Sequence, residues 1–144
     1  MKVNTLTPNL AVADIRQTIQ FYRENLGFNL VMAVPETQDG IDQELSDSKE
    51  YVYAMLKKDD VSLMFQRLDT FHNDGILSDE VSIGASAAFY MQGKGVDAFY
   101  AELKNKNIQV SEMKLTWYGI KEFYVNDNNG YVLGFAEETV KGTG

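Results

Sequence analysis

Carboxylates are the side chains of this sequence best placed to do chemistry. Glu122 stands in an apolar run that leads into the turn at residues 127–130. Its neighbours Phe123 and Val125 fit a buried face, so strand alternation turns Glu122 and Tyr124 to the opposite, concave face. A carboxylate there can act as a general base, as a counter-ion for a cationic ligand, or as a partner in a structural ion pair.

Other reactive residue types are scarce. The chain has no cysteine, which excludes thiolate chemistry, and it has one histidine, His72. His72 lies between Asp69 and Asp74 in a polar segment, and we expect an exposed loop residue there, with a metal site shared with these aspartates as the alternative. The Gly-Lys-Gly at residues 93–95 lacks the spacing of a phosphate-binding loop, and no GxSxG or HExxH motif occurs.

Composition bounds the class of protein. At 144 residues, with 44% hydrophobic and 12% aromatic residues, the chain predicts a single domain, residues 1–144. The net charge of −8 argues against nucleic acid or an anionic membrane as a partner, because both attract clustered Lys and Arg. The N-terminus lacks the apolar region of a signal peptide, and no run approaches the ~20 apolar residues of a membrane span. We therefore expect a cytoplasmic protein.

The first half of the chain has the pattern β, α, β, β, β. A strand is expected over residues 3–12, at an edge or with an irregular start because of Pro8. Asp14 predicts the N-cap of a helix over residues 15–26, and Gly27 predicts its end. Three further strands are expected at residues 28–34, 51–56 and 61–66, with a polar loop at residues 35–50.

A second copy of this order follows a polar linker, residues 68–84. The strands and the helix of this copy are expected at residues 85–92, 96–107, 108–113, 122–125 and 131–136. The last two strands form a hairpin around the Asp-Asn-Asn-Gly turn. Residues 61–65 line up by type with residues 131–135, which supports an internal duplication.

These elements predict an α+β fold. Two tandem βαβββ modules, about residues 1–67 and 85–138, form a curved mixed sheet around a cleft, with the helices on the outer face. The concave face is the expected place for a ligand.

Two segments carry a resemblance to a known family. Residues 14–28 resemble the D-(V/I)-x2-(S/T)-(I/V/L)-x-F-Y…L-G-F signature of the glyoxalase / bleomycin-resistance / extradiol-dioxygenase superfamily, also called vicinal oxygen chelate proteins. Residues 119–137 resemble its closing segment, with Lys121 in place of Arg and Asn128 in place of Pro. The resemblance implies paired βαβββ modules, frequently a homodimer, and in the enzymes a divalent metal in the cleft.

The resemblance also implies four metal-ligand positions. In this sequence they are filled by Thr7, Met64, Ala88 and Gly134. A divalent cation needs imidazole or carboxylate donors, which none of these residues supplies. We therefore expect no metal and no other cofactor, as in the metal-free bleomycin-resistance branch.

Strand alternation nominates the residues of the cleft. They are Thr7, Asn9, Met64, Gln66, Ala88, Tyr90, Gln92, Glu122, Tyr124 and Gly134, with Trp117 and Tyr118 at its mouth or, equally, covering the core or a dimer contact. The cleft that these residues line is roomy and mostly apolar, and it suits an organic molecule with an aromatic or extended body.

Three function classes follow from these residues. The sequence favours a metal-free, antibiotic-resistance-like binding protein that sequesters an aromatic or cationic organic compound in the cleft of a homodimer. The alternative is a superfamily enzyme, a lyase, isomerase or dioxygenase, with non-standard metal ligands or none. The third class is a partner-binding module whose cleft is vestigial.

Overall fold

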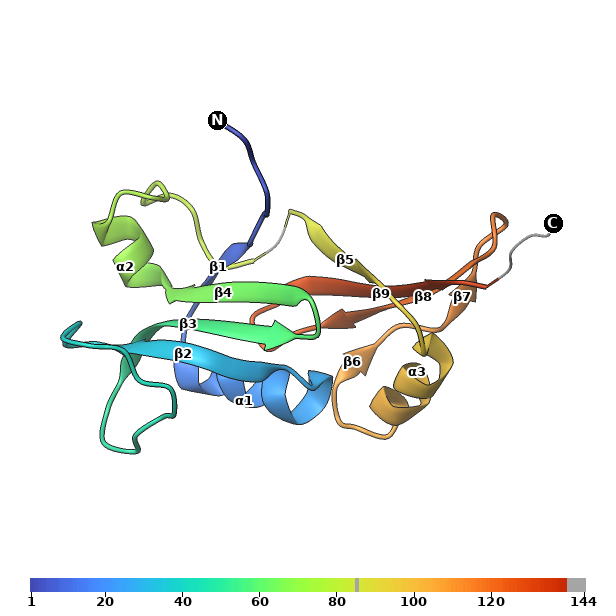
Figure 1. Ribbon diagram of the computed structural model, residues 1–144, viewed down its shortest axis with the longest axis horizontal. Coiled ribbons are helices and arrows are strands. Elements are labelled where there is room, and N and C mark those ends of the chain that lie inside the picture. The colour runs from blue at the N-terminus through green and yellow to red at the C-terminus, as the bar shows by residue number, and fades with distance from the viewer. Residues whose placement is uncertain (85, 140–144) are drawn as a thin grey trace. The chain divides into compact units, whose positions relative to one another are not determined.

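The computed structural model describes residues 1–84 and 86–139, which form two compact units, residues 1–83 and the residues from 84 onward. Each unit has one mixed sheet built on the order β, α, β, β, β, to which unit 1 adds a short helix at its end and unit 2 adds a two-residue strand (Figure 1). The predicted α+β fold of two βαβββ modules is confirmed. Within the described residues, no helix combines the length and the apolar character needed to cross a membrane.

Unit 1 holds a four-stranded sheet. Its elements are β1 (Asn9–Val12), α1 (Ile15–Leu26), β2 (Asn29–Pro35), β3 (Tyr51–Lys58), β4 (Val61–Arg67) and α2 (Leu68–Asn73). The strand order is β1-β4-β3-β2, and β1 runs parallel to β4 at the edge. The prediction of a strand over residues 3–12 is wrong for residues 3–8, because β1 begins at Asn9. Pro8 has no N–H to donate to a sheet, although its carbonyl oxygen accepts from the Met64 N–H at 2.9 Å.

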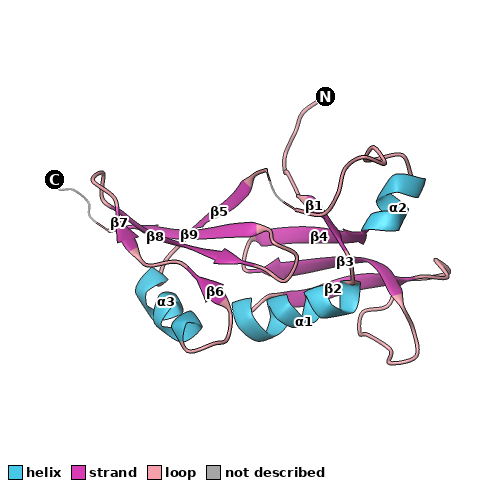
Figure 2. Ribbon diagram, turned by 180° about the vertical axis from the view of Figure 1, so that it is seen from behind, coloured by secondary structure: helices cyan, strands magenta, loops and turns pink. Residues whose placement is uncertain are grey.

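Helix α1 begins and ends where the sequence predicts. The Asp14 carboxylate accepts from the Gln17 N–H at 2.8 Å, and Gly27 turns left-handed with φ of 77°. The buried side chains of α1 are Ile15, Thr18, Ile19, Tyr22 and Leu26. The Tyr22 ring lies 4.9 Å from the Phe65 ring, centroid to centroid. Figure 2 shows α1 lying against the sheet of unit 1, so the core of this unit lies between them.

The segment after β4 differs from the prediction. Residues 68–84 were expected to be a polar linker, but the chain forms the short helix α2 over Leu68–Asn73. Phe71 is 1% exposed and is the buried side chain of this helix. His72 is half-buried on α2 rather than exposed in a loop, and its Nε2 lies 3.1 Å from the Val81 carbonyl oxygen.

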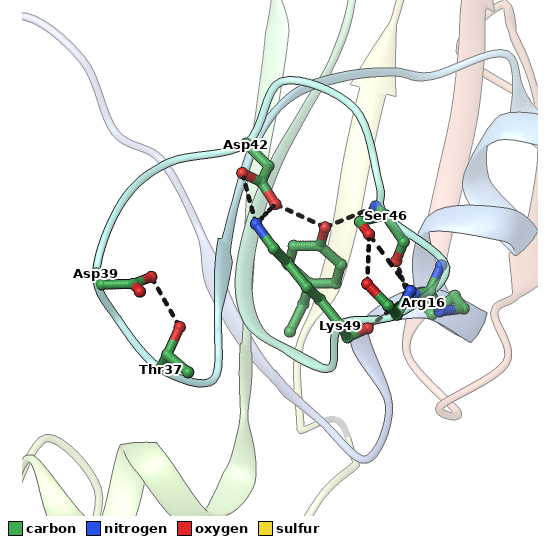
Figure 3. Close-up of polar contacts among 8 residues, drawn as sticks. Arg16, Thr37, Asp39, Asp42, Ser46 and Lys49 are labelled. Atoms are coloured by element: carbon green, nitrogen blue, oxygen red, sulfur yellow. Dashed lines mark hydrogen bonds and ion pairs between the residues drawn. The ribbon is translucent and has the colours of Figure 1, made fainter.

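The polar loop between β2 and β3 is fixed by its own contacts, as Figure 3 shows. The Arg16 guanidinium donates to the carbonyl oxygens of Ser46 and Lys49 at 2.7 and 2.6 Å. Asp42 accepts from the Tyr51 hydroxyl at 2.8 Å and pairs with Lys49 at 3.0 Å. The Tyr51 hydrogen bond, with Lys49 second, lowers the pKa of Asp42. The loop is therefore attached both to α1 and to the start of β3.

Unit 2 repeats the topology of unit 1. Its elements are β5 (Ala88–Gln92), α3 (Val96–Lys104), β6 (Gln109–Val110), β7 (Lys114–Leu115), β8 (Ile120–Asn126) and β9 (Val132–Glu138). The strand order is β5-β9-β8-β6, and β7 also pairs with β8. The first strand starts at Ala88 rather than at residue 85, which lies outside the described residues. The strand predicted at residues 108–113 is reduced to β6.

The core of unit 2 lies between α3 and the closing hairpin. The Phe99 ring lies 6.1 Å from the Phe123 ring and 5.0 Å from the Phe135 ring, centroid to centroid. The Glu137 carboxylate on β9 accepts from the backbone N–H groups of Val96 and Gly95 at 3.0 and 2.8 Å. These N–H groups lower the pKa of Glu137, and the Glu137 carboxylate caps the N-terminus of α3 from β9.

The predicted closing hairpin is confirmed. Asp127 accepts from the backbone N–H groups of Asn129 and Tyr131 at 2.8 Å each, and Gly130 has φ of 88°. A short polar side chain and a glycine with positive φ are what this turn requires. The turn sets the register in which β8 and β9 pair, and this register builds the site described next.

Candidate functional site

Four of the predicted cleft residues come together on one face of the unit 2 sheet. Gly134 on β9 pairs with Tyr90 on β5 and with Tyr124 on β8, so the three lie in one row across three strands. Glu122 precedes Tyr124 by two residues and lies on the same face, because Phe123 between them is fully buried. We call Tyr90, Glu122, Tyr124 and Gly134 the Glu122 cluster.

Both tyrosines of the Glu122 cluster point their hydroxyls at the carboxylate. Tyr90 donates to Glu122 Oε1 at 2.7 Å, and Tyr124 donates to Oε2 at 3.4 Å. The two rings are 6.5 Å apart with an interplanar angle of 38°. Tyr90 is 45% exposed, so solvent reaches its ring. The cluster thus presents a carboxylate between two aromatic rings at the surface of unit 2.

Electrostatics keep both phenols protonated. The hydrogen bond to Glu122 raises the pKa of the Tyr90 hydroxyl far above its ordinary value. Burial, followed by the charge of Glu122, raises the pKa of Tyr124. Two neutral phenols then donate to one carboxylate, and they occupy a lone pair on each of its oxygens. This arrangement anchors the carboxylate, and each of its oxygens keeps a second lone pair for a ligand.

Gly134 is required by the rings that cross it. A Cβ atom at this position would lie 2.8 Å from Tyr124 Cε1 and 2.9 Å from Tyr90 Cδ1. Contacts this short do not occur between packed carbon atoms, so any side chain here must displace a ring. A glycine inside a strand often marks such a close approach.

The residues at the implied metal positions do not fit a divalent metal. Thr7 lies before β1, Met64 offers a thioether, and Ala88 and Gly134 offer no donor at all. At Gly134 the tyrosine rings also take the space that a carboxylate side chain would need. The described residues contain no group of three or more His, Cys, Asp or Glu side chains that could hold a metal ion.

The aspartates around the histidine are each engaged elsewhere. Asp69 accepts from Arg67 at 2.8 Å, and Asp74 accepts from Gln66 at 3.2 Å. His72 instead faces the Val81 carbonyl oxygen. These contacts do not support the alternative of a metal site shared by His72, Asp69 and Asp74.

The other predicted residues of unit 2 lie near the Glu122 cluster without contacting its carboxylate. Ala88 and Gln92 are exposed and flank Tyr90 on β5 by two residues on either side. Trp117 is 94% exposed in the turn between β7 and β8, with its ring 5.0 Å from that of Tyr118. The Tyr118 hydroxyl acts on the pKa of both Tyr90 and Tyr124, which places it in their neighbourhood.

Two predicted residues of unit 1 are joined by hydrogen bonds. Asn9 Nδ2 donates to Gln66 Oε1 at 3.1 Å, and Gln66 Nε2 donates to Thr70 Oγ1 at 3.0 Å and to Asp74 Oδ2 at 3.2 Å. Met64 pairs with Asn9 in the β1–β4 register. Gln66 is 8% exposed, and this network fixes its amide.

A pocket of about 190 Å³ lies beside this network. Its lining residues are Val34, Gln38, Val52, Tyr53, Gln66, Thr70 and Asp74. Of these, the sequence predicted Gln66. Thr70 and Asp74 were missed because their segment reads as a linker, although the spacing of Leu68 and Phe71 is that of one helical turn.

Comparisons with known proteins agree with this architecture. No curated protein sequence matches the chain. The antibiotic binding protein TnmS3 from Streptomyces sp. CB03234 is similar with a TM-score of 0.65 at 19% identity, covering 96% of this chain and 99% of that one. A bleomycin resistance determinant encoded on the transposon Tn5 gives a TM-score of 0.63 at 20% identity, covering 96% and 100%.

A third solved structure and the family profile complete the comparison. A glyoxalase/bleomycin resistance protein/dioxygenase from Nocardioides gives a TM-score of 0.69 at 16% identity, covering 99% of this chain and 89% of that one. At these identities the likeness concerns the fold. The profile of the Glyoxalase/Bleomycin resistance protein/Dioxygenase superfamily matches residues 2–135. The chain therefore belongs to the Glyoxalase/Bleomycin resistance protein/Dioxygenase superfamily.

Proposed function

We propose that this chain is a small-molecule binding protein that works without a metal and sequesters an aromatic or cationic organic compound. The observation that carries the proposal is the hydrogen bond from Tyr90 to Glu122 at 2.7 Å, above a glycine where the family's enzymes carry a metal ligand. A carboxylate beside exposed aromatic rings favours an organic cation through both charge and cation–π attraction.

The ligand class has a second support in the solved structures. TnmS3 is described as an antibiotic binding protein, and another similar structure as a bleomycin resistance determinant. Sequestration asks for affinity without chemistry, and a carboxylate held in place by two phenol donors can serve as the counter-ion of a cationic ligand. We propose in addition that the protein is a homodimer, which sedimentation of the purified chain would test.

The second candidate is an enzyme of the superfamily that uses Glu122 as its base. The carboxylate lies on a partly exposed sheet face, where a substrate can reach it. The hydrogen bonds from Tyr90 and Tyr124 hold the carboxylate in place and leave one lone pair on each oxygen for a substrate proton. Turnover of a bound ligand by the wild-type chain, lost in Glu122→Gln, would favour the enzyme over the binding protein.

Replacing Glu122 by Gln is expected to weaken binding of planar aromatic cations such as ethidium or acriflavine. Gln keeps an acceptor for the Tyr90 hydroxyl and removes the charge, so the cluster keeps its shape. We expect Kd to rise about three- to thirtyfold, between the effect of losing an exposed ion pair and that of losing a charge-assisted hydrogen bond. Quenching of Trp117 fluorescence and isothermal titration calorimetry measure the change.

The matched control for this change is Glu102→Gln. Glu102 is exposed on α3, whose Phe99 ring packs against the buried face of the same sheet. This variant should leave Kd unchanged. The proposal fails if wild-type protein binds no member of the cation panel, or if the two Glu→Gln variants bind equally well.

Metal analysis of the purified protein should find less than one equivalent of Zn, Ni, Fe or Mn. The reason is the lack of imidazole and carboxylate donors at Thr7, Met64, Ala88 and Gly134. Elemental analysis by mass spectrometry after dialysis measures the content. One equivalent of metal in the wild-type protein that is lost in the Glu122→Gln variant would contradict the metal-free proposal.

A further inference from the structure

The pocket of unit 1 is built by three neighbouring strands and α2. Val34 on β2 pairs with Tyr53 on β3, and Tyr53 pairs with Gln66 on β4, so these side chains form one row. Thr70 on α2 and Asp74 at its C-cap extend the row from Gln66. The pocket is therefore formed by residues of unit 1 alone, and no residue of the Glu122 cluster lines it.

Asp74 gives this pocket its charge. The carboxylate accepts one hydrogen bond, to Oδ2, from Gln66. No Lys or Arg lines the pocket, and among the described residues no cation forms an ion pair with Asp74. Because Gln66 is fixed by Asn9 and Thr70 as well, the carboxylate is held at the pocket without a counter-charge. A complementary ligand group must be a cation or a strong donor.

Apolar and aromatic surface forms the rest of the wall. Val34, which pairs with Tyr53, contributes an aliphatic side chain, and Tyr53 contributes a ring and a hydroxyl, while Val52 is buried and turns its side chain to the other face of β3. Burial raises the pKa of Tyr53, so its hydroxyl stays neutral. An ammonium group bonded to Asp74 would have this ring beside it, and the carbon skeleton of the ligand would replace water on Val34.

We propose that this pocket binds the ammonium end of a small organic amine, with Asp74 as counter-ion and Tyr53 and Val34 against the carbon skeleton. The volume of about 190 Å³, in a pocket that is partly open to solvent, leaves room for a small ligand. One carboxylate is a poor set of ligands for a divalent metal ion, which requires several oxygen donors. No residue of the Glu122 cluster lines this pocket, and the proposal does not depend on the function proposed above.

The test compares 2-phenylethylamine with 2-phenylethanol, which has the same skeleton without the charge. Both are titrated into the wild-type protein, and backbone amide NMR signals locate the binding. We expect the amine to shift the signals of Val34, Tyr53 and Thr70 and to bind about tenfold or more tightly than the alcohol, the effect of one charge-assisted hydrogen bond. Equal affinities for amine and alcohol, no binding of the amine, or shifts confined to β8 and β9 would each overturn the proposal.

Asp74→Asn tests the carboxylate itself. Asn keeps an acceptor for Gln66, so the pocket retains its shape, and we expect the preference for the amine over the alcohol to disappear. Asp79→Asn, in the exposed loop after α2, is the matched control and should keep that preference. Thermal unfolding checks that both variants are folded, and an unchanged preference in folded Asp74→Asn overturns the proposal. The wild-type comparison decides the question if Asp74→Asn does not fold.

Discussion

Replacing Phe71 by Ala is expected to lower the free energy of unfolding by about 3–5 kcal/mol, the usual cost of removing a buried phenylalanine. Phe71 is 1% exposed and is the buried side chain of α2. A helix of six residues is not stable in water without tertiary packing, so its attachment depends on this ring. Urea denaturation followed by circular dichroism measures the change.

Asn73→Ala is the matched control for this prediction. Asn73 is exposed on the same helix, and its replacement should change stability by no more than about 0.5 kcal/mol. Hydrogen exchange at the Asp74 amide, which donates to the Thr70 carbonyl at 2.8 Å, reports whether α2 detaches locally. A small stability loss in Phe71→Ala with the Asp74 amide still protected would show that Phe71 does not hold the helix.

The fold was predictable wherever local signals agree with one another. Asp14 and Gly27 mark both ends of α1, and the Asp-Asn-Asn-Gly turn at residues 127–130 fixes the closing hairpin. Each signal acts within a few residues, so no knowledge of the tertiary structure is needed. The prediction of two modules followed from the repeated order of elements, and equivalent strands have the same order in the two sheets.

The misread segments lack such local signals. Helix α2 has one buried side chain, Phe71, among polar residues, so its apolar period is too short to detect. Its N-cap position is held by Arg67, which makes no side-chain capping bond. The late start of β1 follows from Pro8, whose effect on the strand the sequence indicated without giving its extent. Tertiary packing, rather than local preference, decides whether α2 forms.

The sequence predicts which face of a strand each site residue lies on, but it does not predict which of these residues contact one another. Alternation along β8 places Glu122 and Tyr124 on one face because Phe123 and Val125 are buried. The hydrogen bond from Tyr90 to Glu122 joins residues 32 positions apart and depends on the register of β5, β9 and β8. In the same way, Asp74 reaches Gln66 because α2 follows β4 directly. Contacts of this kind require the assembled sheet.

Replacing Gly134 by Ala is expected to destabilise the protein by about 1–3 kcal/mol, the usual range for overpacking. The new Cβ would lie 2.8 Å from Tyr124 Cε1 and 2.9 Å from Tyr90 Cδ1, so one ring must move. Gly93→Ala is the matched control, because a Cβ there meets no atom within 4 Å. Chemical denaturation of the two variants gives the difference.

Removing one ring tests the cause of this loss. In the Tyr90→Ala background, the Cβ added at Gly134 has one ring fewer to displace, so Gly134→Ala should cost less than in the wild type. If Gly134→Ala lowers stability equally in the wild type and in the Tyr90→Ala background, Tyr90 does not make the glycine necessary. If Gly134→Ala in the wild type costs no more stability than Gly93→Ala, neither ring makes it necessary.

Gly134→Glu, which restores the carboxylate of the family's metal-dependent members, should be destabilised at least as much as Gly134→Ala. It should also bind no stoichiometric metal, because Thr7, Met64 and Ala88 still lack imidazole or carboxylate groups. Its Glu side chain has to displace Tyr90 or Tyr124, and with them the phenols that hold Glu122. At this position a metal donor and the aromatic cluster exclude each other sterically. A Gly134→Glu variant that is stable and binds one equivalent of zinc would show that the two are compatible.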